Sequence, residues 1–195
     1  LYCLVINQKF QAYHLKYKHR SKVCNKILIT QGGSDTYGLI PKIIGDLEGL
    51  SFKGTLNVLI GSVFNHHKEL SDAIMYSNLN INIIENETEP WKLFYDSDLA
   101  ITGGGITLFE LMSVGVPCIT VTGEAKEIET MSSVKDKTVM IGLYNNIKSN
   151  ILKDTVQYLL NNPNERWVMS NKSKCIIDGL ASERIVRLIE LIYKR

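Results

Sequence analysis

The chain has 195 residues, of which 45% are hydrophobic and 22% charged, so it is long enough for one globular domain with a hydrophobic core. Its 22 basic and 20 acidic residues leave a formal net charge of +2, which gives no reason to expect a nucleic acid as partner. No apolar run approaches the roughly 18 residues of a membrane-spanning helix, so no membrane span is expected.

The first 25 residues differ from the rest of the chain. The opening LYCLVIN resembles a strand, and the following HLKYKHRSK is a charged run without apolar periodicity, which is typical of a linker. The chain begins in the middle of an apolar run and without a Met, which indicates a fragment that lacks its N-terminal portion. We expect residues 1–25 to be the remnant of an N-terminal domain and its linker, and residues 26–195 to form the domain itself.

From residue 26 onward, short apolar runs rich in β-branched residues alternate with longer segments of helical period. Strands are expected at 26–30, 56–60, 81–84, 99–102, 118–121 and 139–141. Helices are expected at 37–47, 66–77, 89–96, 106–114, 127–133, 148–161, 164–177 and 181–193. Because this alternation is typical of parallel strands joined by crossover helices, the sequence predicts an α/β protein, a Rossmann-like three-layer sandwich with a six-stranded, mostly parallel sheet.

The last expected helix, at 181–193, carries one apolar stripe. Ile185, Leu188, Ile189 and Ile192 follow one another at spacings of three and four residues. We therefore expect this helix to pack on the sheet or on a partner domain.

The first candidate site is TQGGSD at residues 30–35, which joins an expected strand to an expected helix. Gly32 and Gly33 allow the backbone to come close to a ligand, and free N–H groups at a helix start favour an anion such as phosphate. Ser34 and Asp35 have an alternative role, as caps of the helix. The turn matches neither G-x-G-x-x-G nor the Walker pattern, which disfavours a nicotinamide-dependent enzyme and a P-loop protein.

The second candidate site is LAITGGGITLFE at residues 99–110, where a strand ends in three glycines before a helix. Ligands of open α/β sheets bind at the carboxyl edge, and three successive glycines indicate a close approach of ligand to backbone. Glu110 lies near the end of the first helical turn, where a carboxylate can accept two hydrogen bonds from a ribose diol; the alternative is a favourable acid near a helix N-terminus. The candidate substrate-binding residues are thus Gly32, Gly33, Ser34, Asp35, Gly103, Gly104, Gly105, Ile106, Thr107 and Glu110.

Two further loops belong to the same expected edge. TGEA at residues 122–125 follows the fifth expected strand and is expected to add contacts to a sugar or phosphate. Glu85, Glu87 and Glu89 precede an expected helix, where acidic residues are favourable in any case. The alternative is that the backbone of this loop reads a nucleobase.

The four cysteines are scattered and show no metal-ligand spacing such as C-x-x-C. They are typical of reduced thiols, which predicts a cytoplasmic protein. The sequence shows no catalytic triad, catalytic dyad or metal constellation, so no metal or cofactor is expected and the catalytic residues stay unknown.

Three segments resemble a known group of proteins: KILITQGGSDTYGLIPKII, SDLAITGGGITLFELMSVGVPCITV and IDGLASERIVRLIE. They are similar to the C-terminal half of the UDP-sugar hydrolase of pseudaminic acid biosynthesis and of related spore-coat polysaccharide proteins. More distantly, they resemble the N-acetylglucosaminyltransferase that makes the lipid precursor of peptidoglycan. The chain departs from the hydrolase group after the strand ITV, where that group has an Asn-Gln pair and this sequence reads GEAKEIET.

The resemblance implies the C-terminal half of a two-domain GT-B fold, with the nucleotide of a UDP-sugar held mainly by this half. It implies that residues 32–34 lie near phosphate or sugar and that Gly104, Gly105 and Thr107 hold the diphosphate. It also implies that Glu110 binds the ribose and that the hydrolase's catalytic His belongs to an N-terminal domain that this chain lacks.

The expected function is therefore nucleotide-sugar binding within an enzyme that cleaves or transfers the sugar, as a hydrolase or a glycosyltransferase of polysaccharide or nonulosonic acid biosynthesis. The fragment by itself is expected to be inactive, because the rest of the active site would come from the missing domain. The alternative is a non-catalytic nucleotide-sugar-binding or accessory module of a larger assembly protein.

Overall fold

The computed structural model describes residues 4–16, 23–148 and 150–193. Within them, the strands are β1 (Lys26–Thr30), β2 (Thr55–Ile60), β3 (Asn80–Glu85), β4 (Leu99–Thr102), β5 (Cys118–Thr122) and β6 (Val139–Leu143). The helices are α1 (Lys9–His14), α2 (Leu39–Asp46), α3 (His67–Met75), α4 (Pro90–Asp96), α5 (Ile106–Ser113), α6 (Glu127–Ser132), α7 (Ile151–Asn161), α8 (Pro163–Lys174) and α9 (Ala181–Tyr193), with the short 3₁₀-helix η1 (Tyr144–Asn146). Every expected strand and helix is present, with ends that differ by up to three residues.

The strands form one six-stranded sheet in the order β3-β2-β1-β4-β5-β6, and all neighbouring pairs are parallel. The register aligns Thr30 of β1 with Thr102 of β4, and Thr102 with Thr120 of β5. These three strands therefore end at one rim of the sheet, and the loops that follow them are neighbours in space.

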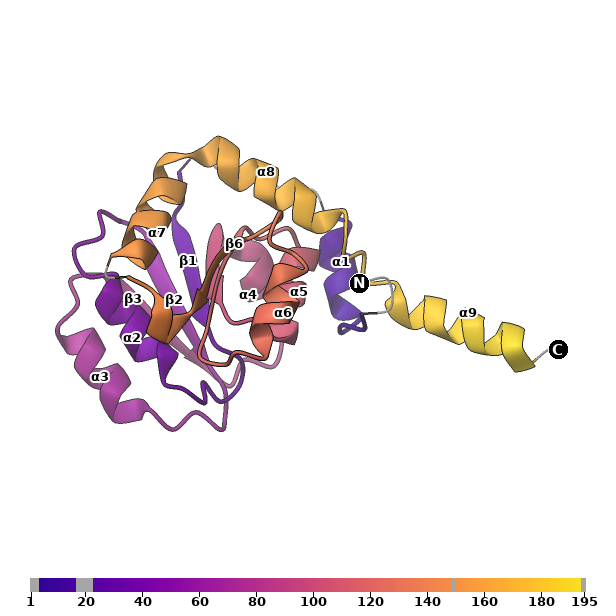
Figure 1. The fold of residues 1–195 in the computed structure, drawn as a ribbon, viewed down its shortest axis with the longest axis horizontal. Helices are drawn as coiled ribbons and strands as arrows, with labels where there is room; N and C mark the ends of the chain where they lie inside the picture. The colour runs from indigo at the N-terminus through magenta and orange to yellow at the C-terminus, as the bar shows by residue number, and fades with distance from the viewer. Residues whose placement is uncertain (1–3, 17–22, 149, 194–195) are drawn as a thin grey trace.

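Helices cover both faces of the sheet (Figure 1). On one face α2, α3 and α7 pack on the sheet, and on the other α1, α4 and α5 do so. Ile27, Leu28 and Ile29 of β1 are fully buried, which explains why this strand shows no alternation of polar and apolar residues. The predicted fold class, a Rossmann-like three-layer α/β sandwich, is confirmed.

The N-terminal segment differs from the prediction. The described part of LYCLVIN, residues 4–7, forms no strand, and it leads into the unpredicted helix α1. Ile6 and Phe10 are buried in the core cluster beneath α4 and α5, where the Phe10 ring lies 5.8 Å from that of Phe94. Only six residues long, α1 is too short for a clear helical period, and its packing on α4 and α5 stabilises it. Residues 17–22, most of the expected linker, lie outside the described residues, and the domain boundary at residue 25 stays a prediction.

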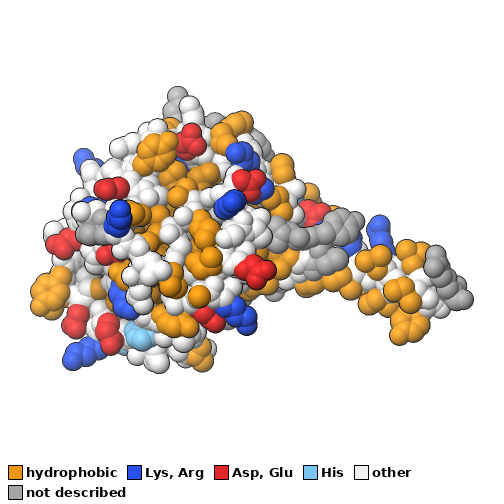
Figure 2. Space-filling model, in the orientation of Figure 1, with side chains coloured by type: hydrophobic (Ala, Val, Ile, Leu, Met, Phe, Trp, Pro, Cys, Tyr) orange, Lys and Arg blue, Asp and Glu red, His pale blue; other side chains and the backbone are white. Residues whose placement is uncertain are grey.

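The C-terminal helix α9 extends away from the sheet (Figure 1). Apolar side chains gather on it at the surface (Figure 2), and Ile189, Leu191 and Ile192 are 48%, 65% and 71% exposed. Of the two expectations for this helix, packing on the sheet is therefore wrong, and packing on a partner domain stays a prediction. No described helix is both long enough and apolar enough to cross a membrane.

Candidate functional site

The two glycine-rich turns lie side by side at the carboxyl edge of the sheet. The turn at 32–34 follows β1 and the turn at 103–105 follows β4, and these two strands are hydrogen-bonded neighbours. From β1 the chain moves outward to β2 and β3, and it then returns to the other side of β1 as β4. This reversal of strand order is the position at which open α/β sheets bind their ligands.

Two hollows flank the turn after β1, and we name them by the strands beside them. The β2-side hollow, of about 440 Å³, is lined by residues that include Gly32, Gly33, Gly61, Glu87, Thr107 and Glu110. The β5-side hollow, of about 290 Å³, is lined by residues that include Gly32, Gly33, Gln31, Thr107, Glu124 and Glu127. Gly32, Gly33 and Thr107 line both, so the two hollows meet at the glycine turn and the first turn of α5.

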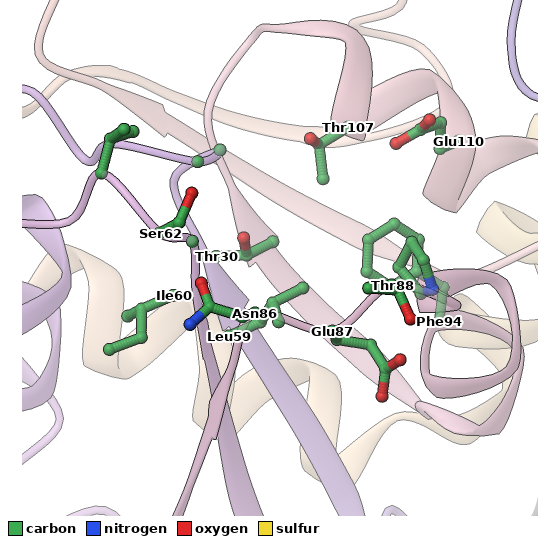
Figure 3. A pocket seen from close by; sticks show the side chains of 15 residues that line it. Thr30, Leu59, Ile60, Ser62, Asn86, Glu87, Thr88, Phe94, Thr107 and Glu110 are labelled. Atoms are coloured by element: carbon green, nitrogen blue, oxygen red, sulfur yellow. The ribbon is translucent and has the colours of Figure 1, made fainter.

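In the β2-side hollow, α5 faces the loop between β3 and α4. Thr107 and Glu110 lie on one side, and Asn86 and Glu87 lie on the other (Figure 3). The floor is the end of β1, where Thr30 lies. This hollow thus places Glu110, which was expected to bind ribose, opposite the loop of Glu87. For that loop the sequence left two roles open: contact with a nucleobase, or acidic residues that are favourable near the start of a helix.

Glu110 has an unusual electrostatic environment. Burial raises the pKa of its carboxyl from 4.5 to about 7. A group that titrates near neutral pH in a concave site is typical of functional carboxylates, because ligand donors replace the water that burial removes.

The turn after β1 is held by Asp35, which binds its own chain. The Asp35 side chain is 2% exposed, and its two oxygens accept hydrogen bonds from the N–H groups of Leu39 (2.7 Å) and Ile40 (2.8 Å). Burial raises the pKa of this carboxyl, and the two backbone hydrogen bonds oppose that rise. Asp35 therefore caps α2, as one of the two sequence interpretations proposed, and it lines the β5-side hollow together with Gly32, Gly33 and Ser34.

Helix packing explains why the triple-glycine turn needs a glycine at position 104, which the sequence did not show. A Cβ atom on Gly104 would lie 2.7 Å from Met131 Cγ and 2.9 Å from both the Cβ and the carbonyl oxygen of Glu127. The Gly104 N–H donates to Glu127 Oε2 at 2.9 Å, so this amide already has an acceptor from α6. The close approach expected of a ligand is here made by α6, and Gly103, Gly105, Ile106 and Thr107 are the members of the motif that line the β5-side hollow.

Sequence reasoning missed several residues of the site. Gly61 follows β2, and a Cβ on it would lie 2.5 Å from the Gly33 carbonyl oxygen, so it allows the two turns to touch. Glu127 lines the β5-side hollow, and so does Gln31, which belongs to the predicted TQGGSD turn but was not among the residues expected to bind. In the sequence, the one indication of a role for these residues is that each follows the carboxyl end of a strand. Only the strand order shows which strand ends are neighbours.

The charged side chains that line the two hollows are all acidic among the described residues. Among the described residues, neither hollow is lined by Lys, Arg or His, whereas both are lined by carboxylates. No group of three or more His, Cys, Asp or Glu within the described chain could hold a metal ion. An anionic ligand would therefore depend on backbone N–H groups, on hydroxyls such as Thr107, and on the helix dipole of α5, whose first turn is capped by no side chain in the described part of the chain.

No family model matches the chain. The chain is 24% identical over 196 aligned residues to the spore coat polysaccharide biosynthesis protein SpsG of Bacillus subtilis, covering 98% of this chain and 57% of SpsG. The predicted resemblance to spore-coat polysaccharide proteins is thus confirmed. The resemblance to the pseudaminic acid hydrolase stays a prediction.

Two solved structures share the fold at low sequence identity. MurG of Acinetobacter baumannii superposes with a TM-score of 0.73 at 17% identity, over 95% of this chain and 55% of MurG. A UDP-N-acetylglucosamine 2-epimerase from Listeria monocytogenes superposes with a TM-score of 0.69 at 19% identity, over 96% of this chain and 52% of the epimerase. The Rossmann-like fold of this chain is thus shared with one half of each of these two proteins. The chain spans about half the length of SpsG and of these two structures.

Proposed function

We propose that this chain is the nucleotide-sugar-binding domain of an enzyme that cleaves or transfers the sugar of a UDP-sugar in polysaccharide or nonulosonic acid biosynthesis. The observation that carries the proposal is the meeting of two hollows at Gly32, Gly33 and Thr107, at the point where the strand order reverses. The names of the similar proteins support it, since one takes part in polysaccharide biosynthesis and another is described as acting on UDP-N-acetylglucosamine.

The dimensions and chemistry of the hollows suggest how the ligand lies. The uridine occupies the β2-side hollow, with its ribose diol on Glu110 and its base against the loop that carries Glu87. The diphosphate lies over Gly33 and Thr107, where free N–H groups at the start of α5 and the positive end of its dipole stabilise the charge. The sugar extends into the β5-side hollow.

The domain's share of catalysis is to stabilise UDP as the leaving group. Negative charge develops on the diphosphate as its bond to the anomeric carbon breaks, and preorganised N–H and O–H donors lower the free energy of that charge. Water as the acceptor makes the protein a hydrolase, and a sugar or lipid hydroxyl makes it a glycosyltransferase. The chain spans about half the length of SpsG, so the proposal places the acid and base in an N-terminal domain outside it, and we expect the chain by itself to turn over no UDP-sugar.

The second candidate is a non-catalytic module that binds a nucleotide sugar within a larger assembly protein. Binding without chemistry is compatible with hollows whose charged lining residues, among those described, are all carboxylates. Turnover of UDP-sugar by a longer protein that contains this chain supports the enzyme, and binding without turnover supports the module. For either, a cytoplasmic location is part of the proposal.

The nucleotide site is tested by thermal unfolding and titration calorimetry at pH 8, where Glu110 is ionised. UDP at one hundred times its Kd raises the free energy of unfolding by about 2.7 kcal/mol, whereas AMP and NAD give smaller shifts. Glu110→Ala weakens UDP binding by about tenfold or more, because the ribose loses charge-assisted hydrogen bonds, and it changes pyrophosphate binding little.

The matched control is Glu69→Ala, which removes an exposed acid from the first turn of α3, away from both hollows. It should leave UDP binding unchanged. Equal stabilisation by UDP, AMP and NAD contradicts a uridine site, and equal losses of UDP and pyrophosphate in Glu110→Ala contradict the ribose contact.

A further inference from the structure

Glu127 is one of three acidic side chains that line the β5-side hollow, with Glu124 and the helix cap Asp35. It is the first residue of α6 and is half-buried. Its Oε2 atom accepts hydrogen bonds from the Gly104 N–H at 2.9 Å and from the Thr122 hydroxyl at 2.5 Å. These two donors fix the carboxylate against the triple-glycine turn, at the wall of the hollow.

One oxygen of this carboxylate remains available. Both hydrogen bonds use Oε2, and among the described residues Oε1 accepts none. The Oε1 atom would also be the nearest atom to a Cβ on Gly105, at 3.5 Å, so it faces the glycine turn that lines the hollow. A fixed acceptor with a free oxygen in a concave site suits a ligand that donates a hydrogen bond.

The neighbours of Glu127 add acceptors and negative charge. Gln31 donates through Nε2 to the Val121 carbonyl oxygen at 3.4 Å, which leaves its Oε1 as an acceptor near Gly103. Glu124 lines the same hollow and is exposed. Since no Lys, Arg or His lines the hollow among the described residues, no basic side chain there offsets a second negative charge.

We infer that Glu127 determines which sugar this site accepts: a sugar that presents O–H or N–H donors, either neutral or amino-bearing, and not one that carries a carboxylate. The inference rests on the proposed function and goes beyond it by naming the substrate class. Glu127 Oε1 accepts a hydrogen bond from the sugar, and Glu127 and Glu124 repel an acidic sugar. Juxtaposed like charges in a partly desolvated site cost enough to exclude a ligand that is otherwise the same.

The test compares UDP-glucose with UDP-glucuronate, which differ only by a carboxylate in place of a hydroxymethyl group, and uses UDP as reference. Calorimetric titration of the 195-residue chain should show UDP-glucuronate binding about tenfold or more weakly than UDP-glucose. In Glu127→Gln, which keeps the shape and loses the charge, the ratio of the two affinities should fall at least threefold when each affinity is referred to that of UDP in the same variant. Glu129→Gln, the same change on an exposed position of the same helix, should leave the ratio unchanged.

The outcomes separate the inference from the proposed function. If the wild-type chain binds UDP and binds both sugars equally well, the selectivity is absent and the inference is overturned, while the nucleotide site stands. If folded Glu127→Gln keeps the wild-type ratio, Glu127 is not the determinant. If the wild-type chain binds no UDP, the proposed function fails and the inference fails with it. If Glu127→Gln does not fold, Glu124→Gln replaces it: a twofold fall in the ratio supports the inference, and an unchanged ratio overturns it.

Discussion

The turns after β1 and after β4 have similar sequences and differ in what their backbone N–H groups bind. After β1, Asp35 accepts hydrogen bonds from two N–H groups at the start of α2, so the helix terminus is satisfied by its own chain. After β4, no described side chain accepts a hydrogen bond from the first N–H groups of α5. The carboxylate of Glu110, in the same helix, lines a hollow and has no hydrogen-bond partner among the described residues. The start of α5 is therefore the better candidate for binding an anionic ligand, although the Gly104 N–H before it already has Glu127 as acceptor.

The same contrast exists within the triple-glycine turn. Gly104 is needed because α6 packs on it, and Gly105 and Thr107 line a hollow. Residues of the same turn thus have two roles: Gly104 allows α6 to pack, and Gly105 and Thr107 face the candidate ligand site. Substitutions should separate the two groups, because the first group lowers stability and the second lowers binding.

The largest expected effect is on the α2 cap. Asp35→Ala removes both acceptors, leaves two buried N–H groups unpaired and places Ala at a φ of 44°, which Asp tolerates better. We expect the free energy of unfolding, measured by urea denaturation, to fall by about 3 kcal/mol. Asp35→Asn, which keeps one oxygen acceptor, should lose about half as much. Wild-type stability in Asp35→Ala would contradict the structural role of this turn.

A second test compares two glycines. In Gly104→Ala the new methyl meets the Glu127 carbonyl oxygen at 2.9 Å, and we expect a loss of about 2 kcal/mol in stability. In Gly33→Ala the methyl meets no atom within 4 Å, so stability should change by less than about 0.5 kcal/mol. UDP binding should nevertheless weaken, because the methyl enters the space that both hollows share. Equal stability losses in the two variants would contradict the division between structural and ligand-facing glycines.

The smallest expected effect concerns Glu110. Its pKa in the folded chain, about 7, lies above the ordinary 4.5, so between these values the native state holds a proton that the unfolded chain has released. The stability that this proton contributes is lost as pH rises through 7. Glu110→Gln, which stays neutral, should therefore match the wild type below pH 4.5 and exceed it by about 1 kcal/mol at pH 8, with an allowance for partial exposure.

Urea denaturation at pH 4.5 and pH 8 measures the difference. Glu110→Gln should bind UDP more weakly at pH 8 although it is more stable. This is expected where a partly buried carboxylate lowers the stability of the fold but contributes to ligand binding. A Glu110→Gln variant that is less stable than the wild type at pH 8 would show that Glu110 supports the fold.

The order of strands and helices could be predicted, because elements that are buried in a protein have a recognisable local pattern of apolar residues in the sequence. Runs such as ILIT and NVLIG are short, apolar and bounded by turn residues, and each forms a strand. Helix α1 could not be predicted, because its stability comes from Phe10 packing against Phe94, a contact between residues 84 positions apart. In α9 the apolar stripe correctly predicted a helix but could not show what the stripe contacts.

The candidate site could be predicted in part. Gly32, Gly33, Thr107 and Glu110 were found from their positions after strands, and the structure brings them to one hollow. The two roles of Asp35 could not be separated in the sequence, because a capping carboxylate and a ligand-binding one occupy the same place in such a turn. Whether the candidate residues bind a nucleotide sugar stays a prediction for the experiments above.

The sequence by itself determined the element types, their order and the existence of glycine-rich turns after two strands, because periodicity and turn chemistry act over a few residues. Only the tertiary structure decided that β1 and β4 are neighbours, that α6 occupies the Gly104 N–H and that Glu127 and Glu110 face two hollows that meet. The reason is physical: strand order depends on which side of the sheet each crossover takes, and helix packing joins residues that are distant in the chain. Neither the strand order nor the helix packing can be recognised from a local stretch of sequence.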